Sequence, residues 1–315
     1  MRTTLIHNPN AGDDADQPTP GQLRALIREA GHRVRTRSVK KKGWSKVLKR
    51  KPTDLVVVAG GDGTVGKVAR RLAGRGIPIA VLPMGTANNI SKTLGLAGQP
   101  IHRLIREWED DERLEFDAGV AKGPWGTRYF IEAVGTGLFA WTMPVVTRNR
   151  TMANLTQSDV KVAYALQLLR DRLETIKPMQ INATLDGRDI SGRYLLFEAM
   201  NTRYIGPNLY LAPHVAHSAG MLDVVFVTEK DRSKLARYLE SWQAGKPHAP
   251  EFGVGRGRHL EMEWTGRPLH IDDKLWPAKG ERKPKAPATI EIELERAALE
   301  FLVPEREKPP KRRKK

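Results

Sequence analysis

The sequence predicts an α/β protein of two domains, a doubly wound parallel sheet followed by a mostly antiparallel, β-rich second domain. In the first part of the chain, short apolar runs alternate with stretches of helical spacing, which is typical of βα units and a parallel sheet covered by helices on both faces. After residue 115 the pattern changes to strands joined by hairpin turns such as Asp186-Gly187. With 315 residues the chain is long enough for two domains.

The expected elements of the first domain follow one another in a regular order. The apolar run at residues 55–59 ends at a cluster of glycines, which indicates a buried strand, a turn and the start of a helix. Strands are expected over residues 3–8, 32–39, 55–59 and 77–82, and helices over 21–30, 44–50, 65–73, 90–94 and 101–109.

The second domain is expected over residues 116–280. Its expected strands cover residues 114–122, 127–133, 179–185, 194–200 and 222–228, and its amphipathic helix covers 158–173. A last pair of strands is expected over residues 288–294 and 298–303, after a connection rich in Lys and Pro.

The most informative stretch is LVVVAGGDGTVGK at residues 55–67, which contains the turn Gly60-Gly61-Asp62-Gly63-Thr64. A glycine turn between a strand and a helix directs free backbone N–H groups and the positive end of the helix dipole at one point, and this favours a phosphate. The stretch therefore indicates an enzyme that handles a nucleotide.

Three less favoured interpretations of this turn stay open. The spacing of Gly61, Gly63 and Gly66 fits the dinucleotide fingerprint, but the acid expected about 20 residues further on is missing from residues 83–89. Gly61, Gly66 and Lys67 nearly fit a Walker A loop, although Val68 stands where Ser or Thr should ligate magnesium. The third is a plain tight turn.

Two further loops follow predicted strand ends. The first strand leads into Asn8-Pro9-Asn10-Ala11-Gly12, and the strand at residues 77–82 leads into PMGTANN at residues 83–89. Strand ends at one edge of a parallel sheet meet in the crevice where such folds bind ligands. NPNAG, GGDGT and PMGTANN, in this order and spacing, resemble the catalytic domain of the diacylglycerol kinase and sphingosine kinase superfamily, in particular the bacterial soluble lipid kinases. NAD kinase and phosphofructokinase share a GGDG-type loop, but there no GTxN loop of this kind follows.

The resemblance implies an ATP-dependent lipid kinase with Mg²⁺ and an NAD kinase-like fold, in which residues 288–304 return to complete the first domain, residues 1–115. Phosphoryl transfer requires donors for the phosphates, a metal and a base that orients the attacking hydroxyl. Asp62 would reach magnesium directly or through water, and its alternative role is to cap the following helix. The expected nucleotide-binding residues are Asn8, Gly12, Gly60, Gly61, Asp62, Gly63, Thr64, Gly85, Thr86 and Asn88.

The base is expected near the C-terminus, in His270-Ile271-Asp272-Asp273-Lys274, which lies where the lipid kinases carry an Asp-Gly-Glu motif. Asp272 matches the Asp of that motif and is the residue expected to accept the hydroxyl proton. Lys274 stands where the family has a Glu, and Asp273 could supply a carboxylate one position away. A solvated turn is the alternative interpretation of Asp272-Asp273-Lys274.

Two further positions depart from the family pattern. The lipid kinases commonly continue GGDGT with a hydrophobic residue, Asn and Glu, where this chain has Val65-Gly66-Lys67. In the segment that resembles their Asp-Gly-x-Leu-Asp sequence, Ala219 replaces the first Asp and Asp223 remains. We therefore expect no accessory magnesium site. These departures put catalytic competence and substrate in question, although not the fold.

The charge is strongly basic, with 53 Lys and Arg against 36 Asp and Glu, a net +17. Such a surface attracts an anionic membrane, nucleic acid or phosphorylated ligands. Residues 305–315 form a basic tail that is expected to be disordered, and residues 33–51 are a second basic segment. Peripheral contact with an anionic membrane is the favoured interpretation, a nucleic acid is the less favoured partner, and a homodimer stays open.

The chain contains no cysteine, and no run of about 18 apolar residues that would suggest a transmembrane helix. No signal peptide is visible, and a cytoplasmic protein, with contact at the inner membrane face, is expected. The leading interpretation is phosphorylation of a hydroxyl of diacylglycerol or a related lipid. The alternatives are a kinase of the same fold that acts on another hydroxylated metabolite, and a catalytically degraded protein that binds a nucleotide or an anionic lipid.

Overall fold

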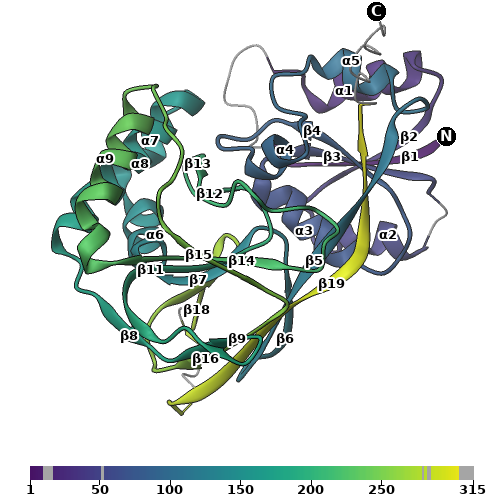
Figure 1. Ribbon diagram of the computed structural model, residues 1–315. Coiled ribbons are helices and arrows are strands. Elements are labelled where there is room, and N and C mark those ends of the chain that lie inside the picture. The colour runs from purple at the N-terminus through teal and green to yellow at the C-terminus, as the bar shows by residue number, and fades with distance from the viewer. Residues whose placement is uncertain (10–16, 51–52, 279, 282–284, 305–315) are drawn as a thin grey trace, which may run out of the picture.

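The computed structural model describes residues 1–9, 17–50, 53–278, 280–281 and 285–304. Figure 1 shows two parts, a sheet with helices on both sides at the N-terminal end and a larger assembly of strands with helices along one side. The predicted fold class, a parallel-rich α/β domain and an antiparallel second domain, is confirmed.

The first sheet places its parallel strands in the order β4-β3-β1-β2. Helices α1 and α5 lie on one face and α2 and α3 on the other (Figure 1). The strands are β1 (Arg2–His7), β2 (Arg33–Ser38), β3 (Leu55–Gly60) and β4 (Ile79–Pro83). The helices are α1 (Pro20–Glu29), α2 (Val47–Arg50) after a 3₁₀ turn (Trp44–Lys46), α3 (Asp62–Leu72), α4 (Asn89–Thr93) and α5 (Ile101–Arg106).

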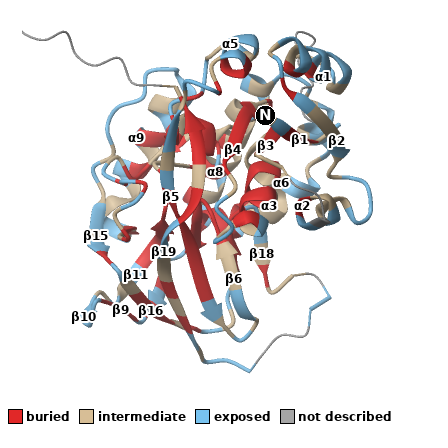
Figure 2. Ribbon diagram, turned by 90° about the vertical axis from the view of Figure 1, so that its right-hand side faces the viewer, coloured by how far each residue is buried: buried red, intermediate tan, exposed pale blue. Residues whose placement is uncertain are grey.

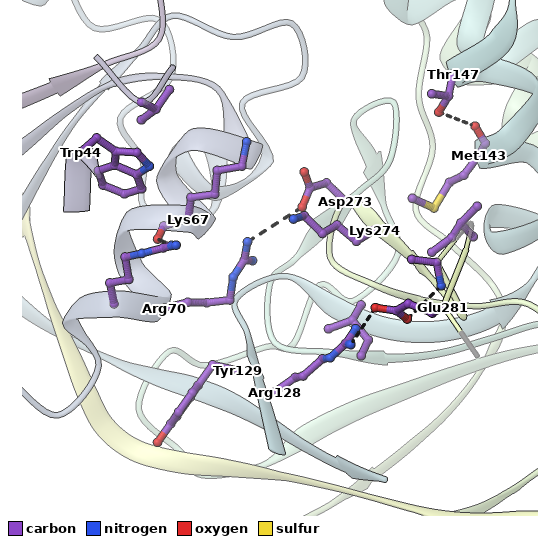
Figure 3. A pocket seen from close by; sticks show the side chains of 15 residues that line it. Trp44, Lys67, Arg70, Arg128, Tyr129, Met143, Thr147, Asp273, Lys274 and Glu281 are labelled. Carbon is purple, nitrogen blue, oxygen red and sulfur yellow. Dashed lines mark hydrogen bonds and ion pairs between the residues drawn. The ribbon is translucent and has the colours of Figure 1, made fainter. Parts of the chain in front are cut away.

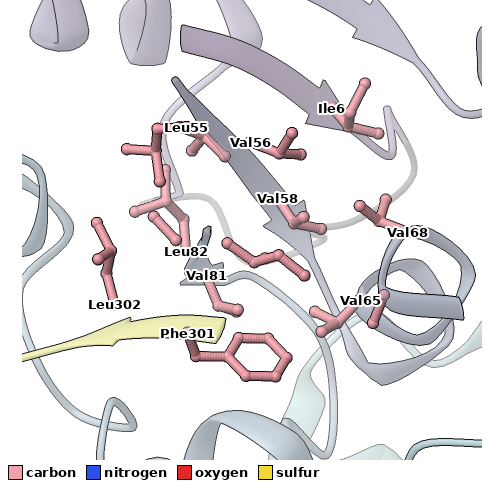
Figure 4. Packing of buried hydrophobic residues seen from close by; sticks show 14 of the residues in the cluster. Ile6, Leu55, Val56, Val58, Val65, Val68, Val81, Leu82, Phe301 and Leu302 are labelled. Carbon is pink, nitrogen blue, oxygen red and sulfur yellow. The ribbon is translucent and has the colours of Figure 1, made fainter. Parts of the chain in front are cut away.

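Burial explains why this sheet forms. Every residue of β3 is buried, as expected for a central parallel strand covered on both faces. Helix α3 packs Val65 and Val68 against this layer, and Phe301 and Leu302 from the end of the chain complete the same core (Figure 4).

The second part is mainly antiparallel. One sheet has the strand order β15-β14-β11-β7-β17-β18, with β8 paired to β11. Helices α6 (Leu138–Arg148), α7 (Arg150–Asn154), α8 (Ser158–Thr175) and α9 (Arg232–Gln243) belong to this part, and a 3₁₀ turn (Glu229–Asp231) precedes α9. The strands of this sheet are β7 (Ala133–Gly137), β8 (Met179–Ile181), β11 (Gly192–Met200), β14 (Leu222–Thr228), β15 (Gly253–Gly257), β17 (Leu269–Ile271) and β18 (Lys274–Trp276).

The remaining strands extend the first sheet or form a short separate ribbon. The ribbon consists of β12 (Tyr204–Ile205) and β13 (Leu209–Tyr210). The extension consists of β5 (Glu112–Gly123), β6 (Gly126–Phe130), β9 (Ala183–Leu185), β10 (Arg188–Asp189), β16 (His259–Trp264) and β19 (Ala288–Val303). The predicted hairpin at Asp186-Gly187 joins β9 to β10.

The expected pair of strands at the end of the chain is wrong, because β19 is one strand of 16 residues. Its pairing with β5 shifts register between Glu295 and Leu299, and Ala297 has a φ of 49°. This bulge bends the strand without ending it. One end of β19 pairs with β16, and the other reaches β4 through Phe301 and Ile79, so β19 runs through both parts (Figure 2).

Two other differences affect the site. The strand expected over residues 127–133 is divided into β6 and β7 at Ile131-Glu132, whose N–H groups bind Asp272 instead of a neighbouring strand. Helix α6, which borders the site, was not expected, and neither were α9 or strands β15 to β18. In the described part of the chain, no helix is long and apolar enough to cross a membrane.

Candidate active site

The two glycine loops of the first domain touch through their backbones. A Cβ atom added at Gly85 would lie 2.2 Å from Cα of Gly61, and one added at Gly61 would lie 2.8 Å from Cα of Gly85. Both distances are too short for any side chain. Since β3 and β4 are adjacent parallel strands, the turns that follow them meet at one edge of the sheet.

Asp62 is the first residue of α3, so the helix begins three residues before the predicted start at Val65 and includes Gly63 and Thr64 in its first turn. Its Oδ1 accepts the N–H of Ile90 at 2.9 Å, which links the two loops. Asp62 therefore satisfies an N–H group at the start of α4. Burial raises the pKa of its carboxyl.

The other expected nucleotide-binding residues differ in how far they are exposed. Thr64 is buried, and its side chain covers Gly60 so closely that a Cβ at Gly60 would lie 2.8 Å away. Asn8 lies just beyond β1, where its N–H donates to the carbonyl oxygen of Ala59 at 3.1 Å.

Asn88 holds the second loop. It adopts the left-handed conformation with a φ of 55°, its Oδ1 accepts the N–H of Gly85 at 2.9 Å, and its Nδ2 donates to the carbonyl oxygen of Gly85 at 2.8 Å. Thr86 is exposed between them. Gly12 lies outside the described residues.

Four carboxylates from three separate segments line a pocket of ≈ 230 Å³, here called the acidic pocket: Asp62, Glu132, Asp272 and Asp273. Glu132 is buried and its Oε1 accepts a hydrogen bond from Asn89 at 3.1 Å. Burial and the neighbouring Asp62 and Asp272 raise the pKa of Glu132 well above the ordinary value. The pocket therefore brings four carboxyl groups together where the two domains face each other.

Asp272 is buried at the wall of the acidic pocket. Its Oδ1 accepts the N–H groups of Ile131 and Glu132 at 3.0 and 2.8 Å, and its Oδ2 forms an ion pair with Arg70. Burial raises the pKa of Asp272, and Arg70 and the two amides oppose this rise. The adjacent Asp273 has 39% of its side chain exposed, against 4% for Asp272.

A buried ion pair lies directly behind this turn. His270 Nε2 is 2.7 Å from Glu198 Oε2, and both side chains are buried. Burial lowers the pKa of His270, but Glu198 and Asp272 together raise it by more, so that the pKa lies above its ordinary value. Burial also raises the pKa of the Glu198 carboxyl, and His270 opposes that rise. Gly135 makes room for the carboxylate, since a Cβ there would lie 1.9 Å from Glu198 Oε2.

A larger basic cavity of ≈ 1010 Å³ opens beside α3. The guanidinium of Arg71 stacks 4.8 Å above the ring of Trp44, and the acids at its wall are Asp273 and Glu281 (Figure 3). Its basic lining residues are Lys67, Arg70, Arg71, Arg128 and Lys274.

A third cavity, the apolar pocket of ≈ 350 Å³, lies between helices α6 to α8 and the second glycine loop. Asp273 and Met143 line this pocket, the acidic pocket and the basic cavity alike. The three cavities therefore adjoin at these two side chains. The apolar side chains that line the apolar pocket include Phe139, Met143, Val146, Val162, Ala165 and Leu169.

Sequence reasoning missed Glu132, Arg70 and Met143. Glu132 is the one acid in the apolar run at residues 130–134, and a lone acid in a predicted strand is a usable signal. Arg70 follows Gly66 by four residues and therefore shares its helix face. No comparable signal marks Met143, because α6 was not expected.

At the expected accessory position, the chain carries internal contacts. Asp223 is buried, with Oδ1 3.4 Å from Nε of Arg256. Nearby, the carboxylate of Asp117 accepts hydrogen bonds from the N–H groups of Gly220 and Ala297 at 2.7 and 2.8 Å. These bonds hold the loop that contains Gly220 against β19. Among the described residues, no group of three or more His, Asp or Glu side chains is arranged to hold a metal ion.

Comparison with known families agrees with this architecture. Residues 2–120 match the family model described as the diacylglycerol kinase catalytic domain, and residues 140–303 match the YegS C-terminal NAD kinase beta sandwich-like domain. The chain belongs to the family of YegS-like lipid kinases.

Relatives of this kinase family cover most of the chain. A protein of Chromohalobacter salexigens named a probable YegS-like lipid kinase is 31% identical over 86% of this chain and 86% of its own. A diacylglycerol kinase of Mycobacterium tuberculosis is 26% identical over 81% of this chain and 78% of its own. A crystal structure of a diacylglycerol kinase from Bacillus anthracis shares the fold, with a TM-score of 0.66 and 20% identity over 96% of this chain and 97% of its own.

Proposed function

We propose that the protein is an ATP-dependent lipid kinase that transfers the γ-phosphate to a hydroxyl of diacylglycerol or a related lipid. The observation that carries this proposal is the meeting of a basic cavity and an apolar pocket at the carboxylates of the acidic pocket. A nucleotide and a lipid bound in the two larger cavities would bring the γ-phosphate and the hydroxyl together at Asp273. The family relation supports a kinase.

The first domain supplies the groups that a nucleotide requires. Residues Gly61 to Thr64 form the N-terminus of α3, which presents backbone N–H groups and the positive end of the helix dipole. Lys67 and Arg71 provide cations beside it. We assign Asn8, Gly60, Asp62, Gly63, Gly85, Thr86 and Asn88 to the same nucleotide site.

Magnesium fits the donor set of the acidic pocket, because carboxylate oxygens are its preferred protein ligands and one or two carboxylates suffice beside substrate phosphates. Asp62 would hold it together with the substrate phosphates. When bound, the ion neutralises charge on the phosphates.

Nucleotide binding and lipid binding are assigned to different domains. We assign residues 1–115, completed by 288–304, to nucleotide binding, and residues 116–280 to lipid binding. Phe301, Leu302 and Val303 pack in the core of the first domain, which supports the completion. The apolar side chains of α6 and α8 that line the apolar pocket support a lipid substrate.

The test is transfer of labelled phosphate from ATP, with magnesium, into a panel of diacylglycerol, monoacylglycerol, sphingoid and water-soluble acceptors. A labelled lipid is the expected product, and its identity fixes the acceptor. A labelled water-soluble product would indicate a kinase for another metabolite. No product together with measurable ATP binding would indicate a degraded member of the family.

We also propose peripheral contact with an anionic membrane through residues 33–51 and the tail at 305–315, which lies outside the described residues. Near an anionic leaflet each Lys or Arg contributes about 1 kcal/mol. Deleting residues 308–315 is expected to weaken sedimentation with phosphatidylserine vesicles at least about tenfold at low salt, while binding to neutral vesicles stays the same. Unchanged binding to anionic vesicles would refute the role of the tail.

A further inference from the structure

Two adjacent carboxylates occupy the turn between β17 and β18, and the structure gives them different surroundings. The oxygens of Asp272 are taken by two backbone N–H groups and by Arg70. A proton on Asp272 would remove the charge that these donors bind. Asp272 therefore stabilises the turn and holds it against Arg70, and its oxygens are not open to a substrate.

Helix α3 is shaped for this ion pair. A Cβ atom added at Gly66 would lie 3.0 Å from Nη1 of Arg70 and 3.6 Å from Oδ2 of Asp272. The absence of a side chain at Gly66 lets the guanidinium lie along the helix and reach the turn. The pair thus fixes the distance between α3 of the first domain and the β17–β18 turn of the second.

Asp273 extends from this fixed turn into the space that all three cavities share. Its Oδ2 faces the first turn of α3, where a Cβ added at Gly63 would lie 3.2 Å away. Arg70 Nη2 is 3.9 Å from Oδ1 of Asp273 (Figure 3). The carboxylate of Asp273 accepts no hydrogen bond from the described residues. It therefore combines an available oxygen with a position beside the proposed phosphate site.

We propose that Asp273, in place of Asp272, is the base that accepts the proton of the acceptor hydroxyl, and that Asp272 and Arg70 are positioning residues. The assignment rests on the proposed kinase function. The hydroxyl oxygen forms a bond to the γ-phosphorus, its proton passes to Asp273, and the bond from the γ-phosphorus to the β,γ-bridging oxygen breaks, so that ADP leaves with the electron pair. The neighbouring Lys274 offers no carboxylate oxygen for this step.

The experiment compares kcat, the KM for ATP and Tm of the full-length protein with Asp273→Asn, Asp273→Glu and Asp272→Asn. Asp273→Asn is expected to lower kcat about 10²- to 10⁴-fold, with Tm within about 2 °C of the unchanged protein. Asp273→Glu is expected to recover part of that loss. Asp272→Asn is expected to lower Tm by roughly 3–10 °C, because buried hydrogen bonds of a charged group are lost.

Asp110→Asn is the matched control, since Asp110 is exposed and belongs to the first domain away from the cavities. If Asp273→Asn keeps more than about a third of kcat while the unchanged protein is active, the base assignment is overturned and the kinase proposal stands. If the unchanged protein transfers phosphate to no acceptor, both are overturned.

Discussion

The two sides of the active site are built in different ways. On the first-domain side the chain supplies backbone, with Gly61 and Gly85 in contact beside the N-terminus of α3. On the second-domain side it supplies buried titratable side chains, namely Glu132, Asp272 and the Glu198–His270 pair.

This difference determines what each side tolerates. A backbone contact excludes every Cβ atom, whatever its chemistry, so the first-domain side is sensitive to added volume. A buried charge is stable only beside a partner that neutralises it, so the second-domain side is destabilised when such a partner is removed. Substitutions on the two sides should therefore fail for different reasons.

The largest effect is expected from the charge side. His270→Ala leaves Glu198 buried without its cation, and removing one partner of a buried ion pair costs about 3–5 kcal/mol. The free energy of unfolding in urea measures this loss. His102→Ala, at an exposed position, should stay within about 0.5 kcal/mol of the unchanged protein. A His270→Ala variant as stable as that control would show that Glu198 accepts a proton at no cost.

A smaller loss is expected from the backbone side. Gly85→Ala places a Cβ 2.2 Å from Cα of Gly61, and such overpacking costs about 1–3 kcal/mol. Because the loops must separate, affinity for ATP should fall as well, which titration calorimetry would measure. Gly21→Ala is the control, since its Cβ would meet nothing closer than 3.8 Å. ATP binding by Gly85→Ala equal to that of Gly21→Ala would contradict the role of the loop contact.

The smallest effect is a change in pH dependence. The pKa of Glu132 is raised in the folded protein, so the folded state binds this proton more tightly than the unfolded state does. The contribution of Glu132 to the free energy of unfolding is therefore greatest at acid pH, below the pKa that Glu132 has in the unfolded chain. It is lost as the pH rises through the higher pKa that Glu132 has in the folded protein. Glu132→Gln keeps an oxygen for Asn89 and cannot ionise.

Glu132→Gln is accordingly expected to raise Tm relative to the unchanged protein at pH 8 and to leave the difference small at pH 4. Thermal unfolding across this range is the measurement, and exposed Glu251→Gln is the matched control. A Tm difference that does not grow between pH 4 and pH 8 would show that Glu132 is not protonated in the folded state.

The same contrast explains what could be predicted from the sequence. The glycine loops are local, since each is a few adjacent residues after an apolar strand, and their order and spacing indicated both the fold and the nucleotide side. The acidic pocket is not local, because Glu132 and Asp272 are 140 residues apart and meet only through β7 and β17. The acids of one segment give no indication of those in the others.

One error of prediction, and one assignment that we propose to change, have physical causes of the same kind. Strand β19 was divided at its polar residues around Arg296, although a bulge with Ala297 at positive φ lets one strand continue. For the base, the motif position favours Asp272, whereas our proposal assigns that role to Asp273. The ion pair with Arg70 that encloses Asp272 depends on Gly66, a distant helix position that the motif does not contain.

The place of β19 in the first domain also affects how the protein is synthesised. Strand β4 pairs with Phe301, and Phe301, Leu302 and Val303 fill part of the core beside it. While the ribosome makes the residues between, β4 is an unpaired edge beside an unfilled apolar core, a state prone to aggregation. The nucleotide-binding half, although made first, must therefore complete its folding last, and chaperones that bind exposed apolar strands are expected to associate with the nascent chain during that interval.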